Sequence, residues 1–339
     1  MIERDNQPKT TRIMMIQNEL INRPETLKDK WLNSPVMRFR GKLSEIQQFI
    51  PEFERREFTL PPAAGETRGT NLRLDTIVRR PFGDDKTFVP VGTVSKDYAL
   101  VSHGAVLEST RKAIAEAGVA TKDTDAAIEI TEYGERMRLS VWLPDKYAFD
   151  PGDGEKMGMR LECLNSVDGS TRFRALMGWF RFVCSNGLVV GVTQSDVNRR
   201  HTGDLSSEQV GYVLASGLAQ AEKEKQNFRN WRERAVNPVR LTAWVEKEVR
   251  EAWGFKAATR VYRIARSGYD VRIVGQYKKR TPATIETVTT DRVPGSPTYS
   301  TNLFEISQVL AWLAKERRDV QEQVEWREQI PALLENMKN

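Results

Sequence analysis

The chain has 339 residues, of which 39% are hydrophobic and 29% charged, a composition that supports a folded core and one or two domains. No run of about 18 apolar residues occurs, so the sequence predicts a soluble protein without a membrane-spanning helix. The 52 Lys and Arg residues exceed the 46 Asp and Glu residues, for a formal charge of +6. This modest excess favours an anionic partner.

The N-terminus and the cysteines indicate the cellular compartment. Acidic and basic residues precede a short apolar patch in "MIERDNQPKTTRIMMIQNEL", which is not the layout of a secretory signal. The two cysteines, Cys163 and Cys184, cannot build a framework of disulfides. The sequence therefore predicts a cytoplasmic protein.

The first 70 residues differ in composition from the rest of the chain. A short helix is expected before Pro24, followed by a charged region and by "LPPAAGETRGTN" at residues 60–71, whose Pro, Gly and Thr are typical of a linker. We predict an N-terminal helical and charged extension with a linker over residues 1–70. An α+β core domain is expected over residues 71–339, with a helical part from about residue 204.

The core begins with a strand in "FVPVGTVSKDYALVS" and a helix that Ser102 caps and Gly118 ends. Two stretches that alternate apolar and polar residues follow, one around Tyr133 and Gly134 and one around Asp168 and Gly169. Such alternation around a Gly-containing corner is typical of β-hairpins. A further strand, "GWFRFVCSNGLVVG" at residues 178–191, is favoured over a helix, with Asn186 and Gly187 as its turn. The sequence predicts an antiparallel meander sheet packed by helices.

From residue 204 helical spacing dominates. One helix is expected after Ser206, and a second begins at Pro238 and ends at Gly254. Residues 270–300 predict one or two strands and a long loop. A long C-terminal helix follows Asn302, with apolar residues at spacings of three and four through Val324. A helix packed on its own domain is favoured, and a homo-oligomer through residues 302–330 is the alternative.

Catalytic motifs are sparse. His103 and His201 lie at no metal-ligand spacing, and no glycine loop ends in the Lys-Ser/Thr pair that binds nucleotide phosphates. Cys184 sits among apolar residues, which is typical of a core position. An acidic cluster is interpreted as a solvated loop in preference to a nuclease site; its members are Asp145, Asp150, Asp153 and Glu155. The sequence predicts no cofactor, no metal site and a non-enzymatic protein.

Basic and aromatic residues carry the main functional expectation. A kink at Gly178 is expected to bring Arg172, Arg174, Trp179 and Arg181 to one face of the sheet. Cations that hold phosphates, with rings that stack on unpaired bases, suit single-stranded DNA, although arginine on a solvated sheet face is also ordinary. The predicted nucleic-acid-binding residues are Arg172, Arg174, Trp179, Arg181, Arg199, Arg200, Tyr277, Lys278, Lys279 and Arg280.

The string "LNSVDGSTRFRALMGWFRFVCSNGLVVG" resembles family 932 of the domains of unknown function, which includes the YafZ/YfjQ-like prophage group. The segments "FVPVGTVSKDYALVSHGAVLESTRKAIAEAG" and "RRHTGD" are similar to it as well, so the resemblance covers about residues 75–330. It implies a protein of phages, plasmids or other mobile elements. It supplies no catalytic residues.

Three hypotheses follow from the sequence. The first is a nucleic-acid-binding protein of a mobile element that binds single-stranded DNA non-specifically and assists strand annealing or recombination. The second is a protein-binding anti-defence factor. The third, the least favoured, is a metal-dependent nuclease that uses the clustered carboxylates.

Overall fold

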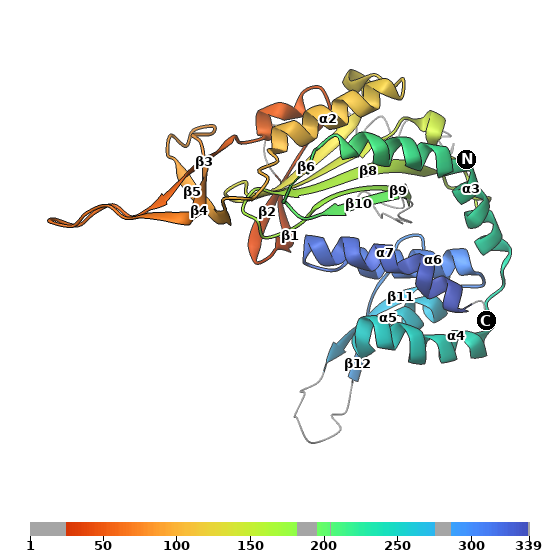
Figure 1. The fold of residues 1–339 in the computed structure, drawn as a ribbon. Helices are drawn as coiled ribbons and strands as arrows, with labels where there is room; N and C mark the ends of the chain where they lie inside the picture. Colours follow the sequence, from red (N-terminus) through yellow and green to blue (C-terminus); the bar gives the residue numbers. More distant parts are fainter. Residues whose placement is uncertain (1–24, 182–194, 204, 275–285, 338–339) are drawn as a thin grey trace, which may run out of the picture.

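The computed structural model describes residues 25–181, 195–203, 205–274 and 286–337. Its centre is a seven-stranded sheet in which every neighbouring pair is antiparallel, in the order β1-β2-β6-β7-β8-β9-β10 (Figure 1). The strands of this sheet are β1 (Glu25–Trp31), β2 (Ser34–Lys42), β6 (Asp125–Thr131), β7 (Arg136–Trp142), β8 (Met157–Ser166), β9 (Phe173–Arg181) and β10 (Ser195–Arg199). The predicted α+β fold with an antiparallel meander is confirmed.

Both predicted hairpins form at the expected corners. Gly134, with φ of +79°, lies in the turn between β6 and β7, and Gly169, with φ of +76°, lies between β8 and β9. A side chain other than glycine is strained at such positive φ. Asp168 also closes its turn, because its carboxylate accepts the Ser170 backbone N–H at 3.0 Å. The hairpin corners therefore set the register of the central strands.

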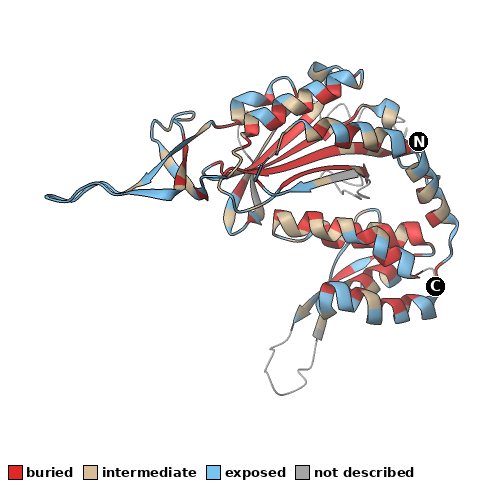
Figure 2. Cartoon of the chain, viewed as in Figure 1, coloured by how far each residue is buried: buried red, intermediate tan, exposed pale blue. Residues whose placement is uncertain are grey.

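One face of the sheet carries the main hydrophobic core. Alternate residues of the central strands, such as Ile128, Leu139 and Leu161, are fully buried there against α2 (His103–Glu116) and α3 (Gln209–Glu233). The central strands are almost wholly buried, and both helices expose their outer faces (Figure 2). A two-residue period along each strand produces this segregation.

The start of one helix agrees with the sequence and the start of the other does not. Ser102 accepts the Ala105 backbone N–H at 3.1 Å and so caps α2 as predicted. Ser206 instead accepts the Glu208 N–H at 3.2 Å, within a turn that precedes α3. The helix consequently begins at Gln209.

The structure corrects the elements expected before residue 71. Residues 25–42 form β1 and β2, and β2 pairs with β6 in the main sheet. Residues 60–69 are the loop between β3 (Phe53–Thr59) and β4 (Thr70–Arg79), which pair directly with each other, so this stretch is a hairpin loop and not a linker. With β5 (Val89–Ser95) these strands form a three-stranded sheet that projects from the molecule (Figure 1). The helix predicted before Pro24 lies outside the described residues.

After α3 the chain forms a C-terminal unit. Asn237 accepts the Val239 N–H at 2.8 Å, so α4 (Pro238–Trp244) starts where predicted. The chain continues through a π-helical turn (Val245–Val249) into α5 (Arg250–Ser267). Gly254 interrupts the helical conformation with φ of +81°, but the helix resumes beyond the predicted end. Two paired strands follow, β11 (Tyr269–Val274) and β12 (Glu286–Arg292), as expected.

The apolar pattern after Asn302 belongs to two packed helices, α6 (Leu303–Lys315) and α7 (Val320–Met337). Asp319 breaks the pattern, because its carboxylate accepts the Gln321 N–H at 2.9 Å and starts a new helix. The apolar residues at this spacing are buried within the chain; they are Leu303, Ile306, Leu310, Leu313, Val320 and Val324. The predicted C-terminal helix is confirmed as α7. A homo-oligomer through residues 302–330 stays a prediction, which would have to use other side chains.

Within the described residues, none of the helices combines the length and the apolar composition that crossing a bilayer requires.

Candidate nucleic-acid interface

The arginines of β9 lie on opposite faces of the sheet. Pairing between β8 and β9 runs without a register shift from Met157 opposite Arg181 to Leu164 opposite Arg174. Gly178 sits regularly within this ladder, so no kink is present and side chains alternate along the whole strand. Arg174 therefore faces one side, whereas Trp179 and Arg181 face the other. The prediction that Arg172, Arg174, Trp179 and Arg181 share one face of the sheet is therefore wrong.

Trp179 is a core residue. Its side chain is fully buried, and its ring contacts Phe149 edge-on at 4.8 Å between centroids and Phe228 edge-on at 6.4 Å. An aromatic ring must be accessible to stack on an unpaired base. Trp179 stabilises the contact between the sheet and α3 and is not placed to meet a nucleic acid.

Arg174 and Arg181 already have acidic partners. Arg174 is 7% exposed and its Nη2 donates to both carboxylate oxygens of Glu328, at 2.6 and 2.5 Å. Arg181 is 6% exposed, forms an ion pair with Asp153 and donates to the Glu155 carbonyl at 3.2 Å. These internal carboxylates neutralise the two cations. The geometry gives neither arginine the open position that phosphate contact requires.

The other predicted residues fall into two groups. Arg172, Arg199 and Arg200 are exposed at one end of β9 and β10. Arg199 lies opposite Phe173, which places Arg199 on the face under α2 and α3. Alternation along the strand places Arg172 on the other face, together with Arg174. Tyr277, Lys278, Lys279 and Arg280 lie outside the described residues, as do Cys184 and the expected turn at Asn186 and Gly187.

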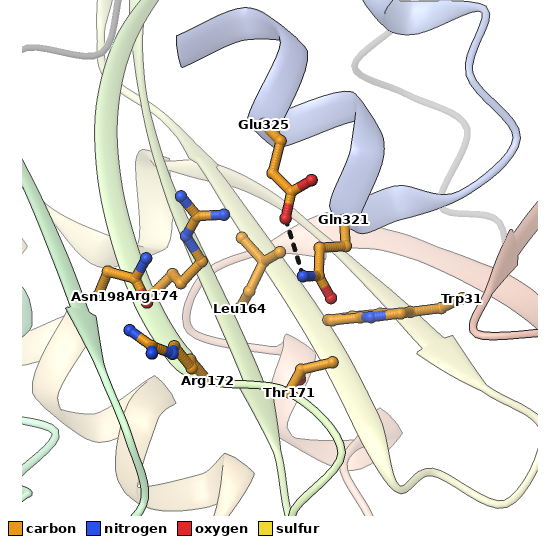
Figure 3. Close-up of a pocket in the computed structure, with 8 residues that line it drawn as sticks. All are labelled: Trp31, Leu164, Thr171, Arg172, Arg174, Asn198, Gln321 and Glu325. Carbon is orange, nitrogen blue, oxygen red and sulfur yellow. Dashed lines mark hydrogen bonds between the residues drawn. The ribbon is translucent and has the colours of Figure 1, made fainter. Parts of the chain in front are cut away.

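Arg172 and Arg174 both line a pocket between the sheet and α7 (Figure 3). The pocket has a volume of about 150 Å³ and is lined by Trp31, Leu164, Thr171, Arg172, Arg174, Asn198, Gln321 and Glu325. Gln321 donates to Glu325 Oε1 at 2.9 Å on one wall, and the two arginines lie with Asn198 on the opposite side (Figure 3). Three buried polar atoms in its walls have no partner among the described residues: Trp31 Nε1, Thr171 Oγ1 and Arg174 Nε.

Beside the pocket, α7 packs on a layer of buried ion pairs. Glu129 accepts from Arg38 Nε at 2.8 Å and from Arg138 Nε at 2.6 Å. Glu162 pairs in the same way with Arg160 and with Arg327 of α7. Because all these groups are held internally, they join the sheet to the C-terminal unit and leave little charge for a ligand.

The pKa values of these residues reflect the strong attraction between the buried carboxylates and the neighbouring arginines. Burial alone would raise the pKa of Glu129, but the neighbouring Arg138 and Arg38 lower it to about 2. The pKa of Glu162 is likewise lowered to about 2, because Arg160 and Arg327 outweigh the effect of burial. Burial lowers the pKa of Arg160 to about 9, against the attraction of Glu162. Both carboxylates are ionised at neutral pH, and breaking either cluster leaves a buried charge.

A different group of cations has no acidic partner among the described residues. Arg263, Arg266 and Arg292 are exposed, and none forms an ion pair with a described carboxylate. Arg263 contacts Thr287 of β12 at 3.5 Å, and Arg266 lies 5.1 Å over the Tyr299 ring. We call Arg263, Arg266 and Arg292, with Tyr269 and Tyr299, the α5–β12 surface.

The elements explain why these residues gather. Arg263 and Arg266 are three residues apart, which places them on neighbouring positions of the α5 surface. Tyr269 is paired directly with Arg292 across β11 and β12 and is 41% exposed. The arginine spacing in "RVYRIAR" is the sequence signal that points to this surface. Sequence reasoning missed it because the helix was not expected to resume after Gly254.

Cys163 and the acidic cluster have structural roles. Burial raises the pKa of the Cys163 thiol to about 12, which disfavours the reactive thiolate. Asp150 accepts backbone N–H groups of Gly152 and Gly154, and Asp153 pairs with Arg181, so the acidic cluster is a structured loop. No group of three or more His, Cys, Asp or Glu residues that could hold a metal ion occurs among the described residues.

The fold and its surfaces define a mixed α+β protein with an antiparallel sheet and separate basic regions. A family model, Domain of unknown function (DUF932), matches residues 90–294, and the chain belongs to this family. Two similar proteins of Escherichia coli (strain K12) are the UPF0380 proteins YfjQ and YafZ, each 38% identical over 65 residues, or 19% of this chain. This chain spans 24% of the length of each. No solved structure matches.

Proposed function

We propose that the protein binds single-stranded DNA through the α5–β12 surface and serves a phage, plasmid or other mobile element. The observation that carries this proposal is the group Arg263, Arg266 and Arg292, exposed beside Tyr269 and without an acidic partner among the described residues. The presence of the resembled family on mobile elements supports the genetic context.

Unpaired cations and exposed rings suit a single strand for different physical reasons. Each arginine that contacts a phosphate releases condensed counterions, which supplies affinity without regard to sequence. A tyrosine ring that is 41% exposed, such as Tyr269, can stack on a base that has no pairing partner. Duplex DNA hides its bases, so the same surface binds it less tightly. Strand annealing is the activity we infer for a protein that holds unpaired bases in this way.

The test compares two variants with the same change in net charge. Arg263→Glu/Arg266→Glu reverses two cations of the α5–β12 surface. Lys112→Glu/Lys122→Glu reverses two exposed lysines near α2, on the other side of the sheet. Fluorescence anisotropy measures binding of a labelled strand of about 15 nucleotides and of its duplex at two salt concentrations. Thermal unfolding of all variants checks that they remain folded.

The wild type is expected to prefer the single strand. The site variant should lose about tenfold or more in affinity and reduce the salt slope by about 1.4, since each single-strand phosphate contact contributes about 0.7. The lysine variant should stay close to the wild type. Equal losses in both variants would assign binding to net charge alone, and no binding at low salt would refute the proposed function.

A second candidate function is protein binding, favoured by the projecting hairpin of β3 and β4. Four large apolar side chains are exposed on or next to it: Phe58 (36%), Leu60 (73%), Leu72 (84%) and Phe88 (47%). Grouped exposed apolar residues often mark protein interfaces. Under this hypothesis the protein associates with a host protein, and this association persists after nuclease treatment. Leu60→Ser/Leu72→Ser abolishes the association, whereas Arg263→Glu/Arg266→Glu leaves the association unchanged.

A further inference from the structure

We propose that the pocket between β9, β10 and α7 receives one pyrimidine base of a bound strand and favours cytosine over thymine. This inference rests on the proposed function, because it adds a base-reading position to single-strand binding. The pocket is separate from the α5–β12 surface in its residues, so the two can be tested independently.

The size of the pocket restricts the ligand. Its volume of about 150 Å³ is below the range of about 300–1,000 Å³ that is typical of sites for drug-sized molecules. An engineered protein cavity of about 150 Å³ accepts one benzene ring. A single six-membered heterocycle therefore fits within this space, whereas part of a larger bicyclic purine would lie outside it.

The charges around the pocket argue against a phosphate in its interior. Arg174 donates to Glu328, and the carboxylate of Glu325 lines the same pocket as the two arginines. A carboxylate in the wall repels an anion at short range. The mixture of acceptors and donors suits a neutral ring that carries both kinds of group.

The distribution of donors and acceptors selects the base. Glu325 Oε1 accepts from Gln321, while Oε2 accepts no hydrogen bond from the described residues. A carboxylate is the usual partner of the cytosine amino group. On the opposite side, Arg172 and Asn198 line the pocket with exposed side chains. Their guanidinium and amide N–H groups are the donors that the ring acceptors of cytosine require.

Thymine fits this arrangement poorly. It presents a carbonyl oxygen where cytosine presents its amino group, so its acceptor would face the Glu325 carboxylate. Leu164, which lies between the two polar sides (Figure 3), offers an apolar floor to either ring. Discrimination therefore depends on the charge and acceptor character of Glu325.

The experiment measures the affinity of the full chain for homopolymers of deoxycytidine and of thymidine, each about 15 nucleotides long, at a pH where cytosine is uncharged. The pocket variant is Glu325→Gln, whose amide both donates and accepts. Glu322→Gln removes the same charge from α7 outside the pocket lining and is the matched control. Arg263→Glu/Arg266→Glu tests the other surface.

The wild type is expected to bind the cytosine strand about tenfold more tightly than the thymine strand. Glu325→Gln should bring this ratio close to one, and Glu322→Gln should preserve it. Arg263→Glu/Arg266→Glu should weaken both strands while leaving the ratio unchanged. Equal wild-type affinities would overturn the base pocket but not the proposed function, and absence of binding to either strand would overturn both.

Discussion

The two faces of the central sheet are both buried but by different chemistry. The face under α2 and α3 is apolar, with side chains such as Leu139 and Leu161 at full burial. The face under α7 carries ion pairs around Glu129 and Glu162, with a small apolar cluster beside them. The first face gains its stability from removal of apolar surface from water. The second depends on each charge keeping its partner.

The largest effect is expected from breaking the charged face. Glu129→Gln leaves Arg38 and Arg138 beside a neutral amide in a buried position. Removing one partner of a buried ion pair typically costs about 3–5 kcal/mol, so the free energy of unfolding should fall by about this amount. Urea denaturation measures it. A loss below about 1 kcal/mol would show that water reaches this layer and screens it.

A cavity in the apolar face should have a comparable but slightly smaller effect. Leu139→Ala removes a fully buried side chain beneath the helices, which typically costs about 2–5 kcal/mol. The same denaturation experiment applies. Unlike Glu129→Gln, this substitution changes no titrating group, so its cost should be the same at pH 7 and at pH 5. A cost that varied over this interval would contradict the assignment of Leu139 to a purely apolar core.

The two faces should also lose part of their contribution to the free energy of unfolding in different pH ranges. Burial lowers the pKa of His103, at the start of α2, from 6.5 to about 4. The unfolded chain therefore takes up a proton before the folded one, and stability falls as the pH decreases from 6.5 towards 4. Glu129 and Glu162, with pKa values lowered from 4.5 to about 2, lose their contribution only between pH 4.5 and 2.

His103→Gln separates these contributions. The variant should lose the His103 part of the decrease between pH 6.5 and 4, which amounts to at most about 3 kcal/mol. It should keep the part due to His201, whose pKa burial also lowers, and the decrease below pH 4.5. Urea denaturation at a series of pH values measures both. If the variant keeps the whole wild-type slope between pH 6.5 and 4, His103 is not the group that titrates there.

The apolar face was readable from the sequence and the charged face was not. Alternating Met137, Leu139 and Val141 predict one buried side of β7, and local corners such as Asp168 and Gly169 predict its neighbours. Arg138 and Glu162 are ordinary solvent-facing residues by local pattern. Besides its partner within the sheet, each has a second partner in α7, with Gln323 lying 185 residues from Arg138 and Arg327 lying 165 residues from Glu162. No local spacing reveals such contacts.

The same limitation explains why the sequence grouped the wrong residues in the candidate site. Arg174 and Arg181 were grouped because a kink was expected at Gly178, whereas pairing of Gly178 with Arg160 keeps the strand regular. Their acidic partners, Glu328 and Asp153, are remote in sequence or belong to another loop. Arg172 is exposed, unlike Arg174 and Arg181. The α5–β12 surface required knowledge that Tyr269 pairs with Arg292 and that Arg266 approaches Tyr299.

The smallest effect is expected at the rim of the charged face. Arg317 and Glu322 form a pair at 2.7 Å, but their side chains are 39% and 43% exposed. Water and salt screen such a pair, so Glu322→Gln should change the free energy of unfolding by about 0.5 kcal/mol or less. Arg317 keeps its position 4.5 Å over the Trp326 ring, which limits the loss further. A cost near that of Glu129→Gln would mean that stability follows the number of ion pairs rather than their burial, and the distinction between the two faces would not hold.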